Sequence, residues 1–139
     1  MTNDLSHADI KRFWENMLRR HPEERRDGRA TQEGTRWHEL DDFDLKISLT
    51  VGSTGVRVFI RGEASANADL IRKRLAAKQA ELEAELCVPM ASPEHGRFFI
   101  DSLAIDLLVE ANWNEAADWL FERGQTYEAA LNEHLRKSR

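Results

Sequence analysis

The stretch 44–63 constrains the fold most strongly, because apolar and polar residues alternate on both sides of a glycine-containing turn. Apolar side chains at every second position predict a strand with one buried face, and Gly52-Ser53-Thr54-Gly55 is typical of a tight turn between two strands. The sequence therefore predicts a β-hairpin with an aliphatic inward face made of Leu45, Ile47, Leu49, Val51, Val56, Val58 and Ile60. Nothing near this hairpin specifies a reaction.

The residues between these aliphatic positions form the outward face of the hairpin. An antiparallel sheet often has one side in the core and one side in solvent. On that basis we expect the outward set to be exposed, with Phe59 as a central surface aromatic between basic side chains. The set reads Lys46, Ser48 and Thr50 on one strand, and Arg57, Phe59 and Arg61 on the other.

Helical patterns flank the hairpin on its N-terminal and C-terminal sides. Ser6 and Asp9 have the spacing of a capping box, which predicts a helix that starts there and ends at His21-Pro22. The charged stretch 22–34 is expected to be a surface loop. Asn67 is expected to cap a second helix that continues to about Leu86, with a buried stripe of Ile71, Leu75, Lys78, Leu82 and Leu86.

The C-terminal third predicts one more strand and one long helix. Residues 97–103 alternate, but a shift of one residue exchanges the two faces, so either Phe98 or Phe99 can face the core. We expect residues 104–109 to extend the sheet. Apolar residues at alternating steps of four and three from Trp113 to Leu135 predict a long C-terminal helix.

The order of these elements predicts a single α+β domain over residues 1–139. The helices are separated from an antiparallel sheet in the sequence, as in α+β folds. We therefore expect an antiparallel sheet built on the central hairpin and covered on one face by helices, including the long C-terminal helix.

The composition indicates the class of protein and its expected location in the cell. The 139 residues are 41% hydrophobic and 32% charged, which is typical of a globular domain, and no uncharged run is long enough for a membrane span. The first residues lack the features of a signal peptide, so we expect a cytoplasmic protein that does not contact membranes. Cys87 is the single cysteine and is expected to be a buried apolar side chain.

The best catalytic candidate is the triplet Asp44-Leu45-Lys46, which is half of a metal-dependent nuclease signature. Such a site needs a second acidic ligand for its metal. The candidates are not well placed, because they lie in the predicted loop or directly before the strand: Asp27, Glu33, Asp41 and Asp42. The five histidines lack metal-site spacing and are expected at the surface. We therefore predict no catalytic residue, no metal site and no cofactor.

Two groups of residues are candidates for binding. Arg72-Lys73-Arg74 falls in the first turns of the predicted second helix, where cations oppose the helix dipole unless an anion binds there. An ion pair between Asp69 and Lys73 explains the same residues without a ligand, and both interpretations stay open.

The second candidate is the outward hairpin face, where Lys46 lies beside Arg57, Phe59 and Arg61. A basic strand with a central aromatic fits single-stranded nucleic acid, and the same face fits a protein partner. Because the net charge is −5, we place a non-enzymatic domain that forms a homodimer or docks on a partner protein first. A nucleic-acid-binding accessory domain is the alternative, and a metal-dependent nuclease is third.

Several residues along the chain form a series of landmarks: Phe13-Trp14, Trp37, Lys78, Leu82-Glu83, Leu86, Trp113 and Trp119. Their order resembles that of an uncharacterised domain family that often occurs C-terminal to predicted restriction-type endonucleases and also as standalone bacterial proteins. The resemblance runs from about Ile10 to Leu135. It implies an α+β accessory or recognition module of a DNA-processing or defence system, without catalytic residues of its own. The chain departs from the family pattern at Cys87, where a glycine is expected, and at Met90, where an aromatic is common.

Overall fold

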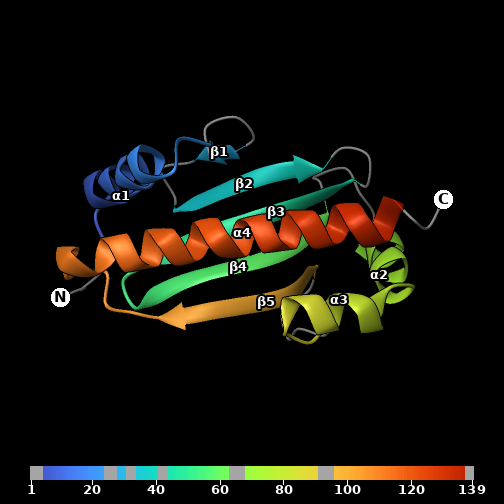
Figure 1. The fold of residues 1–139 in the computed structure, drawn as a ribbon. Helices are drawn as coiled ribbons and strands as arrows, with labels where there is room; N and C mark the ends of the chain where they lie inside the picture. The colour runs from blue at the N-terminus through green and yellow to red at the C-terminus, as the bar shows by residue number, and fades with distance from the viewer. Residues whose placement is uncertain are drawn as a thin grey trace.

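A curved antiparallel sheet with helices over one face forms the centre of the protein (Figure 1). The computed structural model describes residues 5–23, 28–30, 34–40, 44–62, 68–90 and 96–136. The five strands are neighbours in chain order: β1 Gly28–Ala30, β2 Thr35–Leu40, β3 Leu45–Gly52, β4 Gly55–Gly62 and β5 Arg97–Ala104. The helices are α1 His7–Arg20, α2 Ala68–Ala76, α3 Gln79–Leu86, the short 3₁₀ helix η3 Glu110–Asn112 and α4 Trp113–Arg136. The α+β class predicted from the sequence is confirmed.

The predicted hairpin is formed by β3 and β4. Ile47 pairs with Ile60 and Leu49 with Val58, so the aliphatic residues of both strands face the same side of the sheet. All four are fully buried. These side chains belong to the hydrophobic core together with residues of every helix from α1 to α4. The alternation in the sequence therefore identified the inner face correctly.

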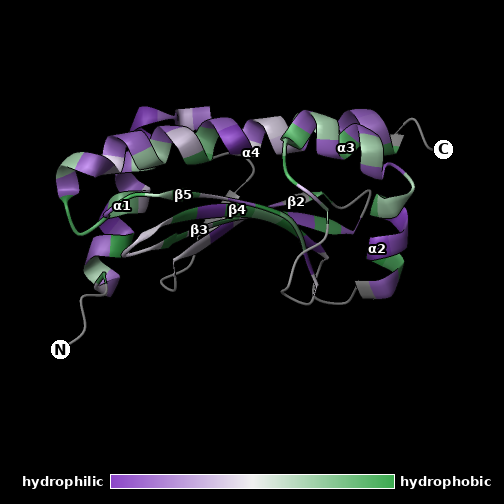
Figure 2. Cartoon of the chain, turned by 90° about the horizontal axis from the view of Figure 1, so that it is seen from below, coloured by the Kyte–Doolittle hydropathy of each residue, from purple (hydrophilic) through white to green (hydrophobic). Residues whose placement is uncertain are grey.

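The helix α4 extends along this inner face, as Figures 1 and 2 show. It is 24 residues long, and its apolar stripe is buried from Trp113 to Leu135. The helix α3 lies beside it, while α1 and α2 stand at opposite ends of the molecule (Figure 2). No described helix spans the opposite side of the sheet between α1 and α2. Helical cover on one face only is thus confirmed.

The predicted cap of the first helix is confirmed, because the Ser6 hydroxyl accepts a hydrogen bond of 3.0 Å from the Asp9 amide. A polar cluster then joins the end of α1 to α4. Arg20 donates two hydrogen bonds to the Asp118 carboxylate, at 3.0 and 2.7 Å, and His21 lies 2.6 Å from the same carboxylate. The His21 ring also stacks on Phe121 with centroids 4.0 Å apart.

The prediction of one continuous helix to Leu86 is wrong. The chain turns at Ala77-Lys78, where the Lys78 amide bonds to the Leu75 carbonyl three residues back, and a separate helix α3 follows. Neither proline nor glycine marks this turn. Its cause is tertiary, because α2 packs on β4 whereas α3 packs on α4. Ile71, Leu75, Leu82 and Leu86 are buried as expected, and Lys78 is partly buried.

A β-bulge in β5 resolves the choice between its two possible faces. The register of β4 and β5 shifts between Val58 and Ile60, and Phe99 has a φ of +53°. Both Phe98 and Phe99 are therefore buried in the core, which strict alternation does not allow. The Tyr127 hydroxyl donates a buried hydrogen bond of 2.7 Å to the Phe99 carbonyl and so connects the bulge to α4.

Residues 104–109 do not extend the sheet as expected. The strand β5 ends at Ala104, and the chain then turns around buried Leu107. The Asp106 carboxylate accepts a hydrogen bond from the Leu108 amide, and the Trp113 indole donates one to the Leu107 carbonyl. The Ile105 and Leu107 amides also donate to the Thr54 and Ser53 carbonyls at 3.1 and 3.0 Å, so the segment stays bonded to the hairpin turn without forming a strand.

Three further expectations are wrong. The segment 28–30 of the predicted loop forms β1, which pairs with β2. Cys87 is exposed, because it ends α3 in the left-handed conformation with a φ of +60°. His38 is buried rather than at the surface, because it pairs with Ile47 and so faces the inner side.

Among the described helices, none is long and apolar enough to cross a membrane.

The close approach of β4 and β5 at the hairpin turn gives a first prediction. A Cβ atom on Gly55 would lie 2.4 Å from the Leu103 carbonyl oxygen, whereas one on Gly52 would meet nothing closer than 3.9 Å. We expect Gly55→Ala to lower the free energy of unfolding by about 1–3 kcal/mol, as overpacking does. The matched control Gly52→Ala should change it by less than about 0.5 kcal/mol. Urea unfolding measures both, and equal effects would contradict the close contact.

The cluster around Asp118 gives a second prediction. Hydrogen bonding from Arg20, with a smaller contribution from His21, holds the pKa of Asp118 below its ordinary value. A carboxylate with a lowered folded pKa stabilises the protein above its unfolded pKa of about 3.9 and loses this effect as the pH falls. We expect Asp118→Asn to lower stability at pH 7 and to reduce the loss of stability between pH 7 and pH 3. Urea unfolding at both pH values tests this, with the exposed Glu115→Gln on the same helix as the control.

Candidate functional site

The side of the sheet turned away from α4, called here the outer face, carries its side chains in rows that cross the strands. Residues that pair across antiparallel strands point to the same face. Two rows matter most. The cationic row consists of Lys46, Arg61 and Arg97, and the aromatic row consists of Trp37, Ser48 and Phe59.

The cationic row places three positive charges side by side on β3, β4 and β5. Lys46 pairs with Arg61, and Arg61 pairs with Arg97. Neighbouring strands are about 4.8 Å apart, and like charges directly opposite each other destabilise a sheet. By backbone register, Glu39 of β2 is paired with Lys46 at the far end of the row. Three cations at adjacent strand positions can together attract an anion.

The aromatic row lies next to the cationic row, and basic side chains lie over its two rings, completely over Phe59 and partly over Trp37. Phe59 is on the outer face, as predicted, but its expected exposure is wrong because only 2% of the residue is accessible. The guanidinium carbons of Arg97 and Arg57 lie 4.7 and 5.7 Å from the Phe59 ring centroid. The Lys46 ammonium lies 5.1 Å from the centroid of the half-buried Trp37 ring. A base therefore has no direct access to the Phe59 ring.

A hydrogen bond fixes the middle of the cationic row. Arg61 Nε donates to the hydroxyl of fully buried Ser48 at 3.0 Å. Cation–π contacts and this bond hold the long basic side chains over the sheet. The cations are thus positioned by the protein itself, which lowers the entropy lost when they bind an anion.

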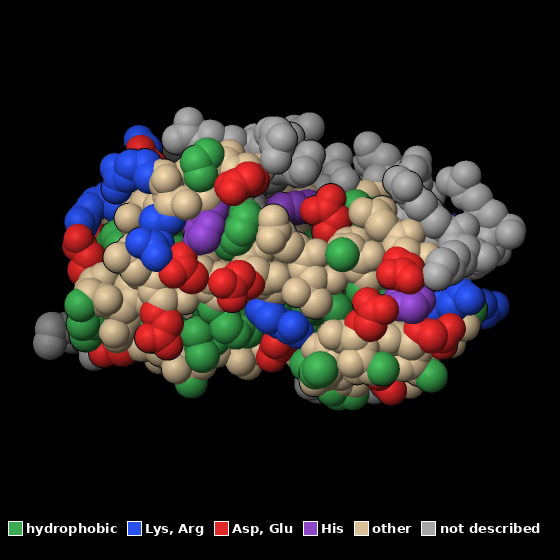
Figure 3. Space-filling view, in the orientation of Figure 1, with side chains coloured by type: hydrophobic (Ala, Val, Ile, Leu, Met, Phe, Trp, Pro, Cys, Tyr) green, Lys and Arg blue, Asp and Glu red, His purple; other side chains and the backbone are tan. Residues whose placement is uncertain are grey.

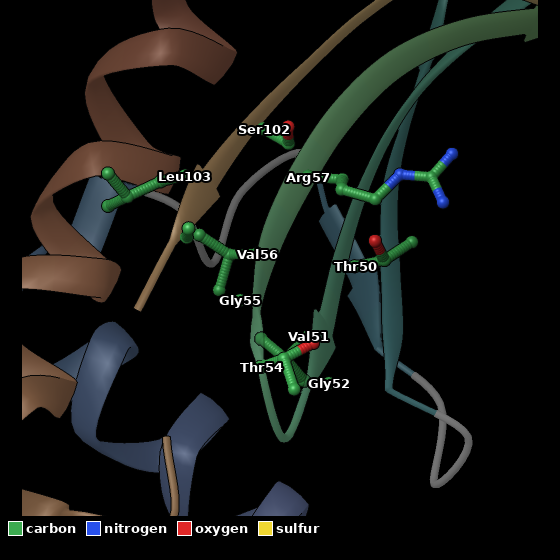
Figure 4. A pocket seen from close by; sticks show the side chains of 10 residues that line it. Thr50, Val51, Gly52, Thr54, Gly55, Val56, Arg57, Ser102 and Leu103 are labelled. Atoms are coloured by element: carbon green, nitrogen blue, oxygen red, sulfur yellow. The ribbon is translucent and has the colours of Figure 1, made fainter. Parts of the chain in front are cut away.

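The hairpin end of the sheet has a depression, called here the hairpin hollow, that is lined by residues of both faces (Figure 4). Its volume is about 410 Å³. In Figure 4 the Thr50 and Arg57 side chains project to one side of β4, and those of Val56 and Leu103 project to the other. The outer-face residues that line the hollow are Thr50, Gly52, Gly55, Arg57, Ser102 and Ala104.

The charge of the outer face contrasts with that of the helical side. The helix α3 contains three acidic residues and α4 contains five, against two arginines in the two helices together. Acidic side chains are spread over these helices in Figure 3. The net charge of −5 is therefore unevenly distributed: α3 and α4 are acidic, the outer face carries the cationic row, and further basic residues lie on α1 and α2.

The other predicted basic group, Arg72-Lys73-Arg74, lies on α2 and not in these rows. Because α2 ends at Ala76, Lys73 and Arg74 are in its last turn, where cations suit the helix dipole, and Asp69 is in its first turn. Arg72 pairs with Asp69 at 2.7 Å. The argument that these cations oppose the dipole was wrong because it assumed a longer helix.

The structure brings Lys46, Arg57, Phe59 and Arg61 together as predicted and adds residues that the sequence analysis missed. Arg97 was missed because the faces of β5 were ambiguous until the bulge was known. Thr50 was part of the predicted outward set, but Ser102 was not assigned to a face. The available signal for Ser102 was the alternation of residues along β5, and this alternation is compatible with either set of side chains facing outward.

The nuclease hypothesis gains no ligand set from the described part of the chain. Asp44 is exposed and precedes β3 with a φ of +57°, while Lys46 lies over Trp37. Within the described ranges, no group of three or more His, Cys, Asp or Glu residues is arranged to hold a metal ion. The proposed second acids Asp27, Glu33, Asp41 and Asp42 lie outside the described residues, as does His95.

Comparisons of the chain with family models, with curated proteins and with solved structures gave no match. The resemblance to the nuclease-associated domain family therefore stays a prediction.

The burial of Phe59 gives a third prediction. A surface phenylalanine contributes little to stability, whereas replacing a buried one with alanine costs about 3–5 kcal/mol. We expect Phe59→Ala to lower the free energy of unfolding by about 3 kcal/mol, at the low end of that range, because it lies under arginine side chains rather than in the main core. Leu70→Ala, at a residue that is 63% exposed, is the control and should change it by less than about 0.5 kcal/mol. A small effect of Phe59→Ala would mean that the ring is exposed in solution.

Proposed function

We propose that this protein binds single-stranded nucleic acid along the outer face of its sheet. The observation that carries the proposal is the cationic row, in which Lys46, Arg61 and Arg97 lie directly side by side in an acidic protein. Adjacent like charges repel one another, and the phosphate groups of a nucleic acid would interact favourably with all three. Because of this local positive charge, we place nucleic acid before a protein partner as the ligand. This reverses the ranking inferred from the net charge.

A homodimer through the outer face is disfavoured by the same charges. In a two-fold dimer the same surface patch meets itself, so the cationic rows of two copies would approach each other. Like charges across an interface cost several kcal/mol. An anionic ligand has no such penalty.

The arrangement of the cations suits an extended chain of phosphates. Lys46 and Arg97 are two strands apart, which is about 10 Å, and Arg57 lies four residues from Arg61 along β4, which is about 13 Å. The half-buried Trp37 and the hairpin hollow offer places for planar bases beside this track. An accessory role beside a DNA-acting nuclease, which the family resemblance implies, is compatible with this ligand.

Salt dependence provides the test of the proposal. If three or four phosphates are neutralised, the logarithm of the binding constant should fall with a slope of about −2 to −3 against the logarithm of salt concentration. The affinity for a 12-nucleotide oligothymidine should then fall about 20- to 50-fold between 50 and 200 mM salt. Fluorescence anisotropy of a labelled oligonucleotide measures this.

Charge-matched variants locate the contact. Lys46→Gln should weaken binding severalfold and make the slope less steep by about 0.7, because one phosphate contact is lost. Arg72→Gln removes the same charge from α2 and should leave both quantities unchanged. Equal weakening by the two variants would contradict binding at the outer face. Competition by poly-glutamate as effective as that by unlabelled oligonucleotide would show an acidic polypeptide to be the better ligand.

The homodimer or protein partner predicted from the sequence stays a second candidate at a different surface. Leu108 and Val109 are adjacent and 48% and 46% exposed, and Ile105 nearby is partly buried. Exposed apolar groups of this kind are typical of small contact sites. Light scattering over a concentration series tests self-association, and a Leu108→Ser variant should remove any dimer that uses this patch.

A further inference from the structure

We propose that the hairpin hollow binds one nucleobase of the bound strand, next to the phosphate track of the cationic row. This inference rests on the proposed function and specifies where one base of the ligand lies. It is carried by the floor of the hollow, by the side chains at its edge and by the position of Arg57 between the hollow and the aromatic row.

The floor of the hollow is almost free of side chains. Gly52, Gly55 and Ala104 pair in one row across β3, β4 and β5 on the outer face. A Cβ atom on Gly52 would meet nothing closer than 3.9 Å, whereas the position of a Cβ atom on Gly55 is taken up by the Leu103 carbonyl oxygen at 2.4 Å. The floor is therefore open at Gly52 and closely packed between β4 and β5 at Gly55, and a flat ring can lie over its Gly52 end. The volume of about 410 Å³ is ample for one base.

The next row forms the polar side of the hollow. Thr50 pairs with Arg57, and Arg57 pairs with Ser102. The two hydroxyl groups can each donate and accept hydrogen bonds, so they fit the edge of any base. The hollow should consequently favour a base over an abasic sugar without strong selection among the four bases.

Arg57 connects the hollow with the rest of the outer face. Its guanidinium carbon lies 5.7 Å from the Phe59 centroid, and the same side chain lines the hollow. Arg57 is also the single charged residue among the described residues that line the hollow. One cation beside a neutral floor fits a base with its attached phosphate better than it fits an isolated anion. The strand would run from the cationic row past Phe59 to the hairpin end.

The test compares strands with and without bases. The probes are a 12-nucleotide oligothymidine and a sugar–phosphate strand of the same length without bases, both at low salt. We expect the unmodified protein to bind the oligothymidine about tenfold more tightly, as base contacts contribute in single-strand binders. We expect Trp37 to contribute to this preference as well. A substitution in the hollow is therefore needed to separate its contribution from that of Trp37.

Ala104→Leu fills the floor of the hollow at an exposed position without changing charge. We expect it to reduce the preference for the base-containing strand at least threefold and to leave the affinity for the abasic strand unchanged. Ser102→Ala is the control, because it removes a hydroxyl without filling the hollow, and it should keep most of the preference. Circular dichroism confirms that both variants fold.

Each other outcome contradicts a specific step. Equal affinity of the unmodified protein for the two strands, or an unchanged preference in Ala104→Leu, would overturn the base subsite while salt-dependent binding still supported the proposed function. Absence of binding to either strand at low salt would overturn the proposed function and the subsite together.

Discussion

The packing of α4 against the inner face of the sheet is the contact on which the rest of the structure depends. The aliphatic residues of β3 and β4 and the apolar stripe of α4 are buried against each other, and the other helices complete this core from the side and the ends. Because side chains alternate along a strand, burial of one set fixes the direction of the other set. The basic and aromatic residues therefore face outward as a consequence of the core.

The elements that local pattern specifies were predicted correctly. Alternation identified β3 and β4, the spacing of apolar residues identified α4, and Ser6 identified the start of α1. The features that were missed depend on contacts between distant residues. The bulge in β5 is connected to Tyr127 on α4, and the break between α2 and α3 follows from packing on two different partners. Neither the bulge nor the helix break can be recognised from the local sequence pattern.

The candidate site was predicted in part for the same reason. Lys46, Arg57 and Arg61 lie where the hairpin pattern placed them, so their side of the sheet followed from sequence alone. The burial of Phe59 depends on Arg97, whose position was fixed only by the bulge. The interpretation of Arg72-Lys73-Arg74 depended on the length of one helix, and it changed when that helix ended at Ala76. The argument from the helix dipole therefore no longer supports an anion site at these residues.

The two sides of the sheet differ in chemistry, because the acidic helices α3 and α4 cover one side and the cationic row lies on the other. We propose that the ligand binds the outer face of the sheet. An amide NMR spectrum recorded during titration with oligothymidine tests it most directly, because each residue reports separately. We predict shifts concentrated in β3, β4 and β5, at residues such as Lys46, Arg61 and Ser102, while α4 changes little. Shifts centred on α1 and α4, with the sheet unaffected, would contradict the account.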